Sequence, residues 1–311
     1  MAKPFLTYKE QVEKLASKGL VIDDAASAMG ALRDIGYFSL VNCYKGLLRD
    51  SDSRRYRIGA TFADLVGLYR FDDRLRELFL HYLMVAERKL RSTLSYSFCC
   101  QNGECQAAYL DPSSYSQDKR SRRSLPKLLK TLDGIASKGT DYPYVVHQRT
   151  RHGNVPLWVT VNAMTFGQVS RMYGCLKPSV KAAIAKQYEY VNERQLEQMM
   201  AVCVLYRNVC AHGERLFDHR VRVDVPDMPL HEGLGLPKKG NQYRFGKRDL
   251  FGVVVSLRYL LPEDEFSSFF NGLESLLLSF SKSCKAVPYE ELLCLMGFPN
   301  NWQKVRQAAA R

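Results

Sequence analysis

The sequence predicts an all-α protein: a helical bundle with additional N-terminal helices and an irregular basic insertion. Three observations support this fold class. Apolar residues recur at helical spacing through much of the chain, glycines and prolines separate these stretches, and helix-capping residues stand at the start of several of them. With 311 residues, of which 46% are hydrophobic, the chain can bury a sizeable core.

Residues 1–60 are predicted to form an N-terminal helical segment. Its first helix covers residues 7–19, because Thr7 can cap the helix and Glu10, three residues later, completes a capping box. A second helix follows a cap at one of two adjacent aspartates, Asp23 or Asp24.

Residues 61–218 are predicted to form the helical core. Apolar side chains keep helical spacing over residues 61–101, which indicates one long helix or two joined helices. Residues 137–156 are polar and contain glycine and proline, so we expect an irregular loop or a subdomain boundary there. Trp158 is expected to fill the core. Further helices are predicted at 157–173, 178–188 and 192–212.

The remainder of the chain divides into an irregular basic insertion, residues 219–249, and C-terminal helices, residues 250–311, that pack on the core. Residues 220–225 alternate apolar and polar side chains and therefore form a short strand or an extended arm. Pro262 is expected to break the first C-terminal helix, and the last helix is predicted at 289–296.

The charge of the chain indicates a polyanionic partner. Lysine and arginine total 45 against 32 aspartates and glutamates, a formal net charge of +13. Nucleic acid is the commonest such partner, and the alternative is a chain that is simply basic. The nine cysteines are odd in number and lack metal-site spacing, which predicts reduced thiols in a cytoplasmic protein. The apolar stretches are too short to predict a membrane span.

The end of the helix predicted at 192–212 carries the sharpest local signal. Arg207 continues the apolar stripe of that helix, and Asn208 and His212 lie four residues apart on one face. Histidine suits proton transfer near neutral pH, and arginine suits a two-pronged grip on phosphate. The structural alternative is that Arg207 pairs with a core carboxylate, Asn208 caps a helix and His212 is a capping cation.

The spacing Arg207-x4-His212, with asparagine after the arginine, resembles the R-x4-6-H signature of HEPN ribonucleases. The wider chain is similar to the Abi-like (AbiD/AbiF) family of abortive-infection proteins in bacterial phage defence. The supporting blocks are spread over nearly the full chain: Lys3–Gln11, Ile35–Phe38, Glu87–Arg91, Pro156–Trp158, Thr165–Gly167 and Leu295–Trp302. Residues 219–248 depart from the family pattern.

The resemblance implies a HEPN-like helical core and an endoribonuclease that needs no metal and no other cofactor. It also implies a homodimer in which two copies of the motif form one composite site, and a role as a defence or toxin effector. His212 would transfer a proton, Arg207 would hold the phosphate, and Asn208 would orient His212 or bind a phosphate oxygen.

Several further residues are candidates for roles around this motif. Glu87 is either a carboxylate that orients Arg207 or the partner of Arg91 in an ordinary ion pair within one helix. Arg215 either binds substrate phosphate or is a solvated charge. Two basic clusters are candidate RNA-binding surfaces, with mobile, solvated loops as the alternative: Lys119, Arg120, Arg122 and Arg123, and Lys238, Lys239, Arg244, Lys247 and Arg248.

Two other functions fit the sequence. In the first, the protein is a non-catalytic, or RNA-restrained, binding protein for a structured non-coding RNA, and the motif is a phosphate-binding patch. In the second, it is a protein-interaction module that uses the helical surface alone. Binding of RNA without cleavage would favour the first, and absence of RNA affinity at low salt would favour the second.

Overall fold

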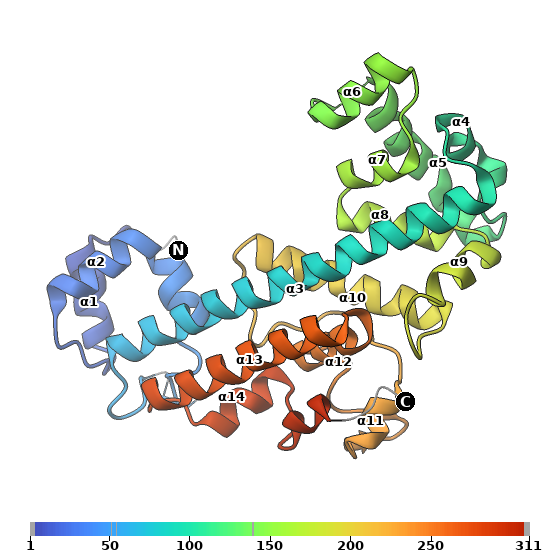
Figure 1. The fold of residues 1–311 in the computed structure, drawn as a ribbon. Coiled ribbons are helices and arrows are strands. Elements are labelled where there is room, and N and C mark those ends of the chain that lie inside the picture. The colour runs from blue at the N-terminus through green and yellow to red at the C-terminus, as the bar shows by residue number, and fades with distance from the viewer. Residues whose placement is uncertain (1–3, 51, 54, 139, 308–311) are drawn as a thin grey trace.

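The structure is a computed structural model that describes residues 4–50, 52–53, 55–138 and 140–307, and these residues form an all-α fold (Figure 1). The predicted fold class is therefore confirmed. Lys3, where the first family-like block begins, lies outside the described residues. In the described part of the chain, the structure contains no helix with the length and apolarity of a membrane span.

The long helix α3 (Phe62–Asn102) is the axis of the molecule. Its 41 residues form one continuous helix about 60 Å long, which links the N-terminal helices at one end to the group α4–α9 at the other (Figure 1). A capping box between Thr61 and Asp64 starts the helix, and Gly103, at φ +89°, ends it.

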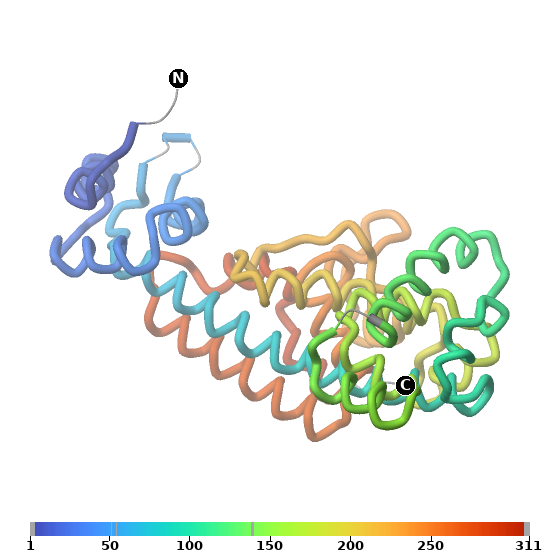
Figure 2. Tube along the Cα trace, turned by 90° about the horizontal axis from the view of Figure 1, so that it is seen from above, coloured from blue at the N-terminus to red at the C-terminus, as the bar shows by residue number. Residues whose placement is uncertain are grey.

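The N-terminal segment packs as a small group at the start of α3 (Figure 2). It contains α1 (Tyr8–Ala16), α2 (Ala25–Ile35) and a π-helical turn (Phe38–Asn42). The predicted capping box between Thr7 and Glu10 is confirmed. Of the two aspartates proposed as the second cap, the structure uses Asp24.

The group at the far end of α3 is built from short helices. Its α-helices are α4 (Gln106–Leu110), α5 (Lys119–Asp133), α6 (Pro143–His152), α7 (Leu157–Ala163), α8 (Phe166–Cys175) and α9 (Pro178–Ala185). A 3-10 turn (Pro112–Ser114) and a π-helical turn (Gly134–Lys138) connect some of them.

Three predictions for this group were wrong. Of the two alternatives for residues 137–156, the irregular loop is contradicted, because α6 forms there with Pro143 in its first turn and Gly153 as its left-handed end. The helix predicted at 157–173 divides into α7 and α8, because Thr165 caps α8 in a capping box. Trp158 is half exposed rather than in the core, because it lies on the solvent side of the two-turn helix α7.

The helix α10 (Glu193–Ala211) lies against α3, α8, α9 and α12 and carries the predicted motif at its C-terminal end. Below it, α13 (Glu263–Ser283) runs along α3 (Figures 1 and 2). Phe79 of α3 and Phe269 of α13 pack edge to face, with 5.1 Å between ring centres. The predicted break at Pro262 is confirmed, since it separates α12 (Leu250–Leu260) from α13. The chain ends with α14 (Tyr289–Met296) and a 3-10 turn (Trp302–Arg306).

The insertion between α10 and α12 is more ordered than predicted. It contains α11 (Pro229–Gly233) and a small antiparallel hairpin, β1 (Lys238–Lys239) with β2 (Gln242–Tyr243), while residues 220–225 form no strand. His231 is fully buried: its Nδ1 accepts from the Met228 backbone N–H at 3.1 Å, and its Nε2 lies 3.0 Å from the Gly246 carbonyl oxygen. This histidine therefore ties α11 to the start of α12.

Candidate functional site

The end of α10 presents Arg207 over a buried carboxylate. The Arg207 side chain is 29% exposed, and its Nε lies 3.7 Å from Oε2 of Glu87 on α3. That Nε is buried and makes no hydrogen bond among the described residues. The guanidinium is thus backed by a carboxylate without being saturated by it, so most of its donors stay available for a ligand.

Glu87 lies between two guanidinium groups. Arg91, one turn along α3, is hydrogen-bonded to Glu87 and also donates to the carbonyl oxygens of Asn162 (2.8 Å) and Met164 (2.6 Å). The ion pair within α3 and the contact with Arg207 therefore exist together. Because Arg91 holds both the carboxylate and the α7–α8 connection, Glu87 has little freedom to move away from Arg207.

His212 and Asn208 lie on the exposed side of the end of α10. His212 is the C-terminal capping residue, and its backbone N–H donates to the Asn208 carbonyl oxygen at 2.9 Å. The imidazole has no polar partner within the described residues. Asn208 Oδ1 lies 3.5 Å from Nη1 of Arg207, so the structure pairs Asn208 with Arg207 rather than with His212.

The segment after His212 is anchored by a buried ionic cluster that the sequence interpretation missed. Asp72 is fully buried and accepts from the backbone N–H groups of Leu216 (3.0 Å) and Phe217 (2.9 Å). It also accepts from Tyr44 Oη (2.8 Å) and from Arg76 Nη1 (2.7 Å). The signal in the sequence is a carboxylate and a guanidinium four residues apart on the apolar face of α3.

Arg215 is held by contacts within the protein. Its Nε lies 2.7 Å from Asp218, and its guanidinium donates to the carbonyl oxygen of Cys43 in the N-terminal segment. These contacts join the end of α10 to the N-terminal helices. To bind substrate phosphate, as predicted, Arg215 would have to share or give up these contacts.

The cysteines of α10 are not activated. Burial raises the pKa of both Cys203 and Cys210 to about 12, so both remain thiols at neutral pH. Burial also raises the pKa of Tyr206, whose neutral hydroxyl donates to the carbonyl oxygens of His219 (2.8 Å) and Arg248 (3.0 Å). These groups therefore hold the end of α10 in place as neutral side chains.

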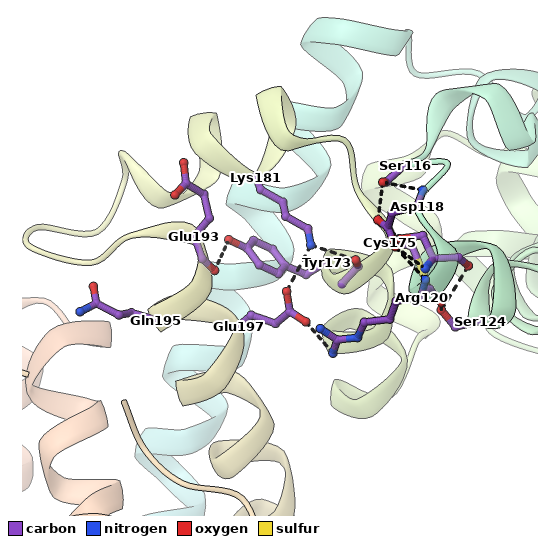
Figure 3. Close-up of polar contacts among 12 residues, drawn as sticks. Ser116, Asp118, Arg120, Ser124, Tyr173, Cys175, Lys181, Glu193, Gln195 and Glu197 are labelled. Atoms are coloured by element: carbon purple, nitrogen blue, oxygen red, sulfur yellow. Dashed lines mark hydrogen bonds and ion pairs between the residues drawn. The ribbon is translucent and has the colours of Figure 1, made fainter. Parts of the chain in front are cut away.

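The first predicted basic cluster does not lie at the motif. Lys119, Arg120, Arg122 and Arg123 stand at the start of α5, near the other end of α10. Arg120 pairs there with Glu197 at 2.7 Å (Figure 3). Glu197 and His212 are separated by about 22 Å along the helix axis. Lys119, Arg120 and Arg123 line a pocket of about 750 Å³, whereas Arg122 does not.

The second basic cluster is partly neutralised inside the insertion. Lys247 pairs with Asp227 at 2.6 Å, and Arg248 pairs with Asp224. The remaining three members, Lys238, Lys239 and Arg244, are exposed on or beside the hairpin. Lys238 lies over the Tyr243 ring, 4.4 Å from its centre, and Arg244 lies 5.7 Å from the centre of the Phe245 ring. The unpaired cations of this cluster are therefore concentrated at the hairpin.

Comparison with known proteins identifies one family. A family model described as Abi-like protein matches residues 30–218, which include the second half of the N-terminal segment, α3 and the whole of α10 with its motif. No curated protein and no solved structure matched the chain. Within the described residues, no three histidine, cysteine, aspartate or glutamate side chains are grouped as metal ligands.

Proposed function

The chain belongs to the Abi-like protein family, and on this basis we propose that it is a HEPN-type endoribonuclease that uses no metal ion. The family takes its name from abortive infection, and the proposal includes a role as a phage-defence or toxin effector. Arg207, Asn208 and His212 carry the proposed chemistry.

One observation carries the proposal. The end of α10 places a guanidinium, an amide and an exposed imidazole together, with Glu87 behind the guanidinium at 3.7 Å. A carboxylate in this position fixes the direction of Arg207 while leaving donors for phosphate oxygens. The imidazole is exposed and makes no polar contact in the described part of the chain, so both ring nitrogens are accessible to a substrate.

RNA carries its own nucleophile for cleavage, so the protein has only to move protons and stabilise charge. The ribose 2′-OH attacks the adjacent phosphorus, the 2′-O–P bond forms and the P–O5′ bond breaks. The products are a 2′,3′-cyclic phosphate and a 5′-OH. His212 accepts the 2′ proton or donates a proton to the leaving oxygen, and Arg207 stabilises the charge that develops on the phosphoryl oxygens.

The proposal includes a homodimer, because the reaction needs one group to accept a proton and another to donate one. Each chain contributes one histidine, His212, at the motif. The other nearby histidine, His219, packs edge to face on Tyr206, with 5.4 Å between ring centres. A second copy of the exposed end of α10 supplies the missing imidazole in one composite site.

The proposal is tested by incubating the purified protein with total RNA in EDTA and analysing the new ends. Cleavage that leaves 2′,3′-cyclic phosphate and 5′-OH ends supports it. Absence of cleavage, with one discrete RNA recovered from the purified protein, would instead support an RNA-bound or RNA-restrained protein. Absence of both cleavage and RNA affinity at low salt would support the interaction module.

A mixing experiment tests the composite site. When wild type and His212→Ala chains are co-expressed at varied ratios, we expect activity to fall as the square of the wild-type fraction, since only wild-type homodimers hold two imidazoles. The measurement is the cleavage rate at constant total protein. A linear fall would show that each chain works alone and would contradict the dimeric site.

Substitution of Glu87 by glutamine tests the support of Arg207. We expect cleavage to slow up to about 100-fold, because the uncharged amide no longer fixes the direction of the guanidinium. The amide can still accept from Arg91, so the contact within α3 is kept. Because only the alignment of Arg207 on the reacting phosphate changes, the loss should appear mainly in kcat. Glu87→Asp should recover part of the rate. An unchanged rate for Glu87→Gln would show that the carboxylate serves only the ion pair within α3.

A further inference from the structure

A cleft lies between the start of α5, α8 and the N-terminal half of α10, away from the motif. Its main pocket has a volume of about 750 Å³, and an adjoining pocket towards α9 has about 560 Å³. Both are lined by Arg120, Glu197 and Ala201, so they are two parts of one depression. Volumes of this size suit a small molecule or a short piece of an extended chain.

The cleft is strongly cationic. In the part of the chain that the structure describes, only two carboxylates, Glu193 and Glu197, line its two parts. The cationic side chains that line them are six: Lys119, Arg120, Arg123, Arg171, Lys181 and Arg194. Of these, Lys119, Arg123, Arg171 and Arg194 make no ion pair or side-chain hydrogen bond within the described residues, whereas Arg120 and Lys181 pair with Glu197. Unpaired cations around a concave surface attract anions.

The ion pair between Arg120 and Glu197 divides the cleft. Figure 3 shows Arg120 reaching across from α5 to Glu197 on α10. The Arg120 side chain is 81% exposed, whereas that of Glu197 is 17% exposed and also pairs with Lys181 at 3.2 Å. Glu197 would keep a cationic partner if Arg120 turned away. Arg120 can therefore exchange this carboxylate for an incoming anion, which would join the two pockets.

The face of α10 that lines the cleft continues along the helix to the motif. Ala201, Asn208 and His212 share one face of the helix, because seven and eleven residues are close to whole numbers of turns. Ala201 and Asn208 are about 10 Å apart along the axis. On the α8 side, the cleft is lined in part by Gly167 and Gly174, which have no side chains to fill it.

We propose that this cleft binds the sugar–phosphate backbone of a single-stranded segment of the RNA substrate, beside the bond that the motif cleaves. Arg123 and Arg171 hold phosphates, and Arg120 leaves Glu197 to hold another. The inference rests on the proposed nuclease function for the identity of the ligand. Beyond that function, it specifies where the RNA binds, that the bound RNA is single-stranded, and that Arg120 exchanges Glu197 for a phosphate.

A single strand fits the cleft better than a duplex. The cations line a depression between three helices, and a rigid double helix bends its backbone into such a depression less readily than a single strand does. A flexible strand can bend into such a groove, and single-strand binding grooves are typically basic. A free nucleotide offers the same phosphate chemistry, and the experiment distinguishes it from RNA.

The test measures binding of a fluorescent single-stranded RNA of about 12 nucleotides by anisotropy. His212→Ala protein serves as background, so that the RNA is not cut. We expect Arg123→Ala to weaken binding about tenfold and to lower the salt slope by about 0.7. The matched control is Arg122→Ala, on the neighbouring residue outside the pocket, which should bind within about twofold of the background.

The Arg120–Glu197 exchange predicts opposite effects for its two partners. Arg120→Ala should weaken binding about tenfold, whereas Glu197→Gln should tighten it about two- to fivefold by removing the competing carboxylate. A purely structural ion pair would weaken binding in both variants. Weaker binding by Glu197→Gln, or equal effects of the Arg122 and Arg123 substitutions, would overturn the proposal.

Competition with other ligands identifies the class of ligand. Displacement of the RNA by an equal concentration of ATP would overturn the proposal in favour of a free-nucleotide site. Tighter binding of an RNA duplex than of the single strand would overturn it as well. If the binding results are as expected but the wild type cleaves no RNA, the cleft stands as a single-strand binding site and the proposed nuclease function fails.

Discussion

Asp72→Ala is expected to lower the free energy of unfolding by about 3–5 kcal/mol, because it removes the buried half of an ion pair and the acceptor of two buried backbone N–H groups. Arg76 is 5% exposed and would lose the carboxylate 2.7 Å from its Nη1. The backbone N–H groups of Leu216 and Phe217 would lose their acceptor at the same time. Each buried donor left without a partner adds to the cost.

The measurement is thermal unfolding followed by circular dichroism, with an expected fall in Tm of about 10 °C. Asp73→Ala is the matched control. Asp73 pairs with the same arginine at 2.8 Å, but its side chain is 51% exposed, so its loss should cost less than about 1 kcal/mol. Similar Tm values for the two variants would show that the buried cluster does not stabilise the fold.

The Asp72 cluster also bears on the site. Gly213, at φ +66°, turns the chain directly after His212, and Asp72 holds the backbone N–H groups of Leu216 and Phe217 shortly after this turn. Arg76 adds a hydrogen bond to the Glu214 carbonyl oxygen at 3.3 Å. Any Asp72→Ala protein that remains folded should therefore cleave RNA more slowly, because the segment after His212 is held less firmly.

Local chemistry explains which parts of the fold could be predicted from the sequence. The capping box at Thr7, the cap at Asp24 and the break at Pro262 each depend on a few neighbouring residues, and all three are confirmed. The length of α3 follows from an apolar repeat without proline. These signals are contained in the segments themselves.

The errors arose where burial, rather than local pattern, decides the structure. The helix α6 is mostly exposed and buries only Val145 among its described residues, so its composition resembles that of a loop. Trp158 has a side chain typical of a core but lies on the outer side of α7. In the insertion, His231 supplies a buried anchor that no periodicity reveals.

The candidate site divides in the same way. Arg207, Asn208 and His212 lie within six residues, so their spacing on one helix already indicated a shared function. Glu87 was recognised as a possible partner, although its distance from Arg207 depends on how α3 and α10 pack. The contact of Asp72 with Phe217 spans 145 residues, and single-sequence patterns carry no information on such a pairing.

His212→Ala is expected to slow RNA cleavage by about 100- to 10,000-fold, the usual contribution of a group that transfers a proton. Its imidazole is exposed and makes no polar contact with the described residues, so the free energy of unfolding should change by less than about 0.5 kcal/mol. The measurement is the initial cleavage rate in EDTA, combined with thermal unfolding of the same preparation.

The matched control for this prediction is His152→Ala. His152 is also exposed, but it ends α6, which lies apart from the end of α10 in Figure 1. Removal of this imidazole should leave both the cleavage rate and Tm unchanged. If both histidine variants cleaved RNA as fast as the wild type, His212 would have no part in proton transfer. The motif would then act as a phosphate-binding patch, and the cleft beside α5 would serve an RNA that is bound rather than cut.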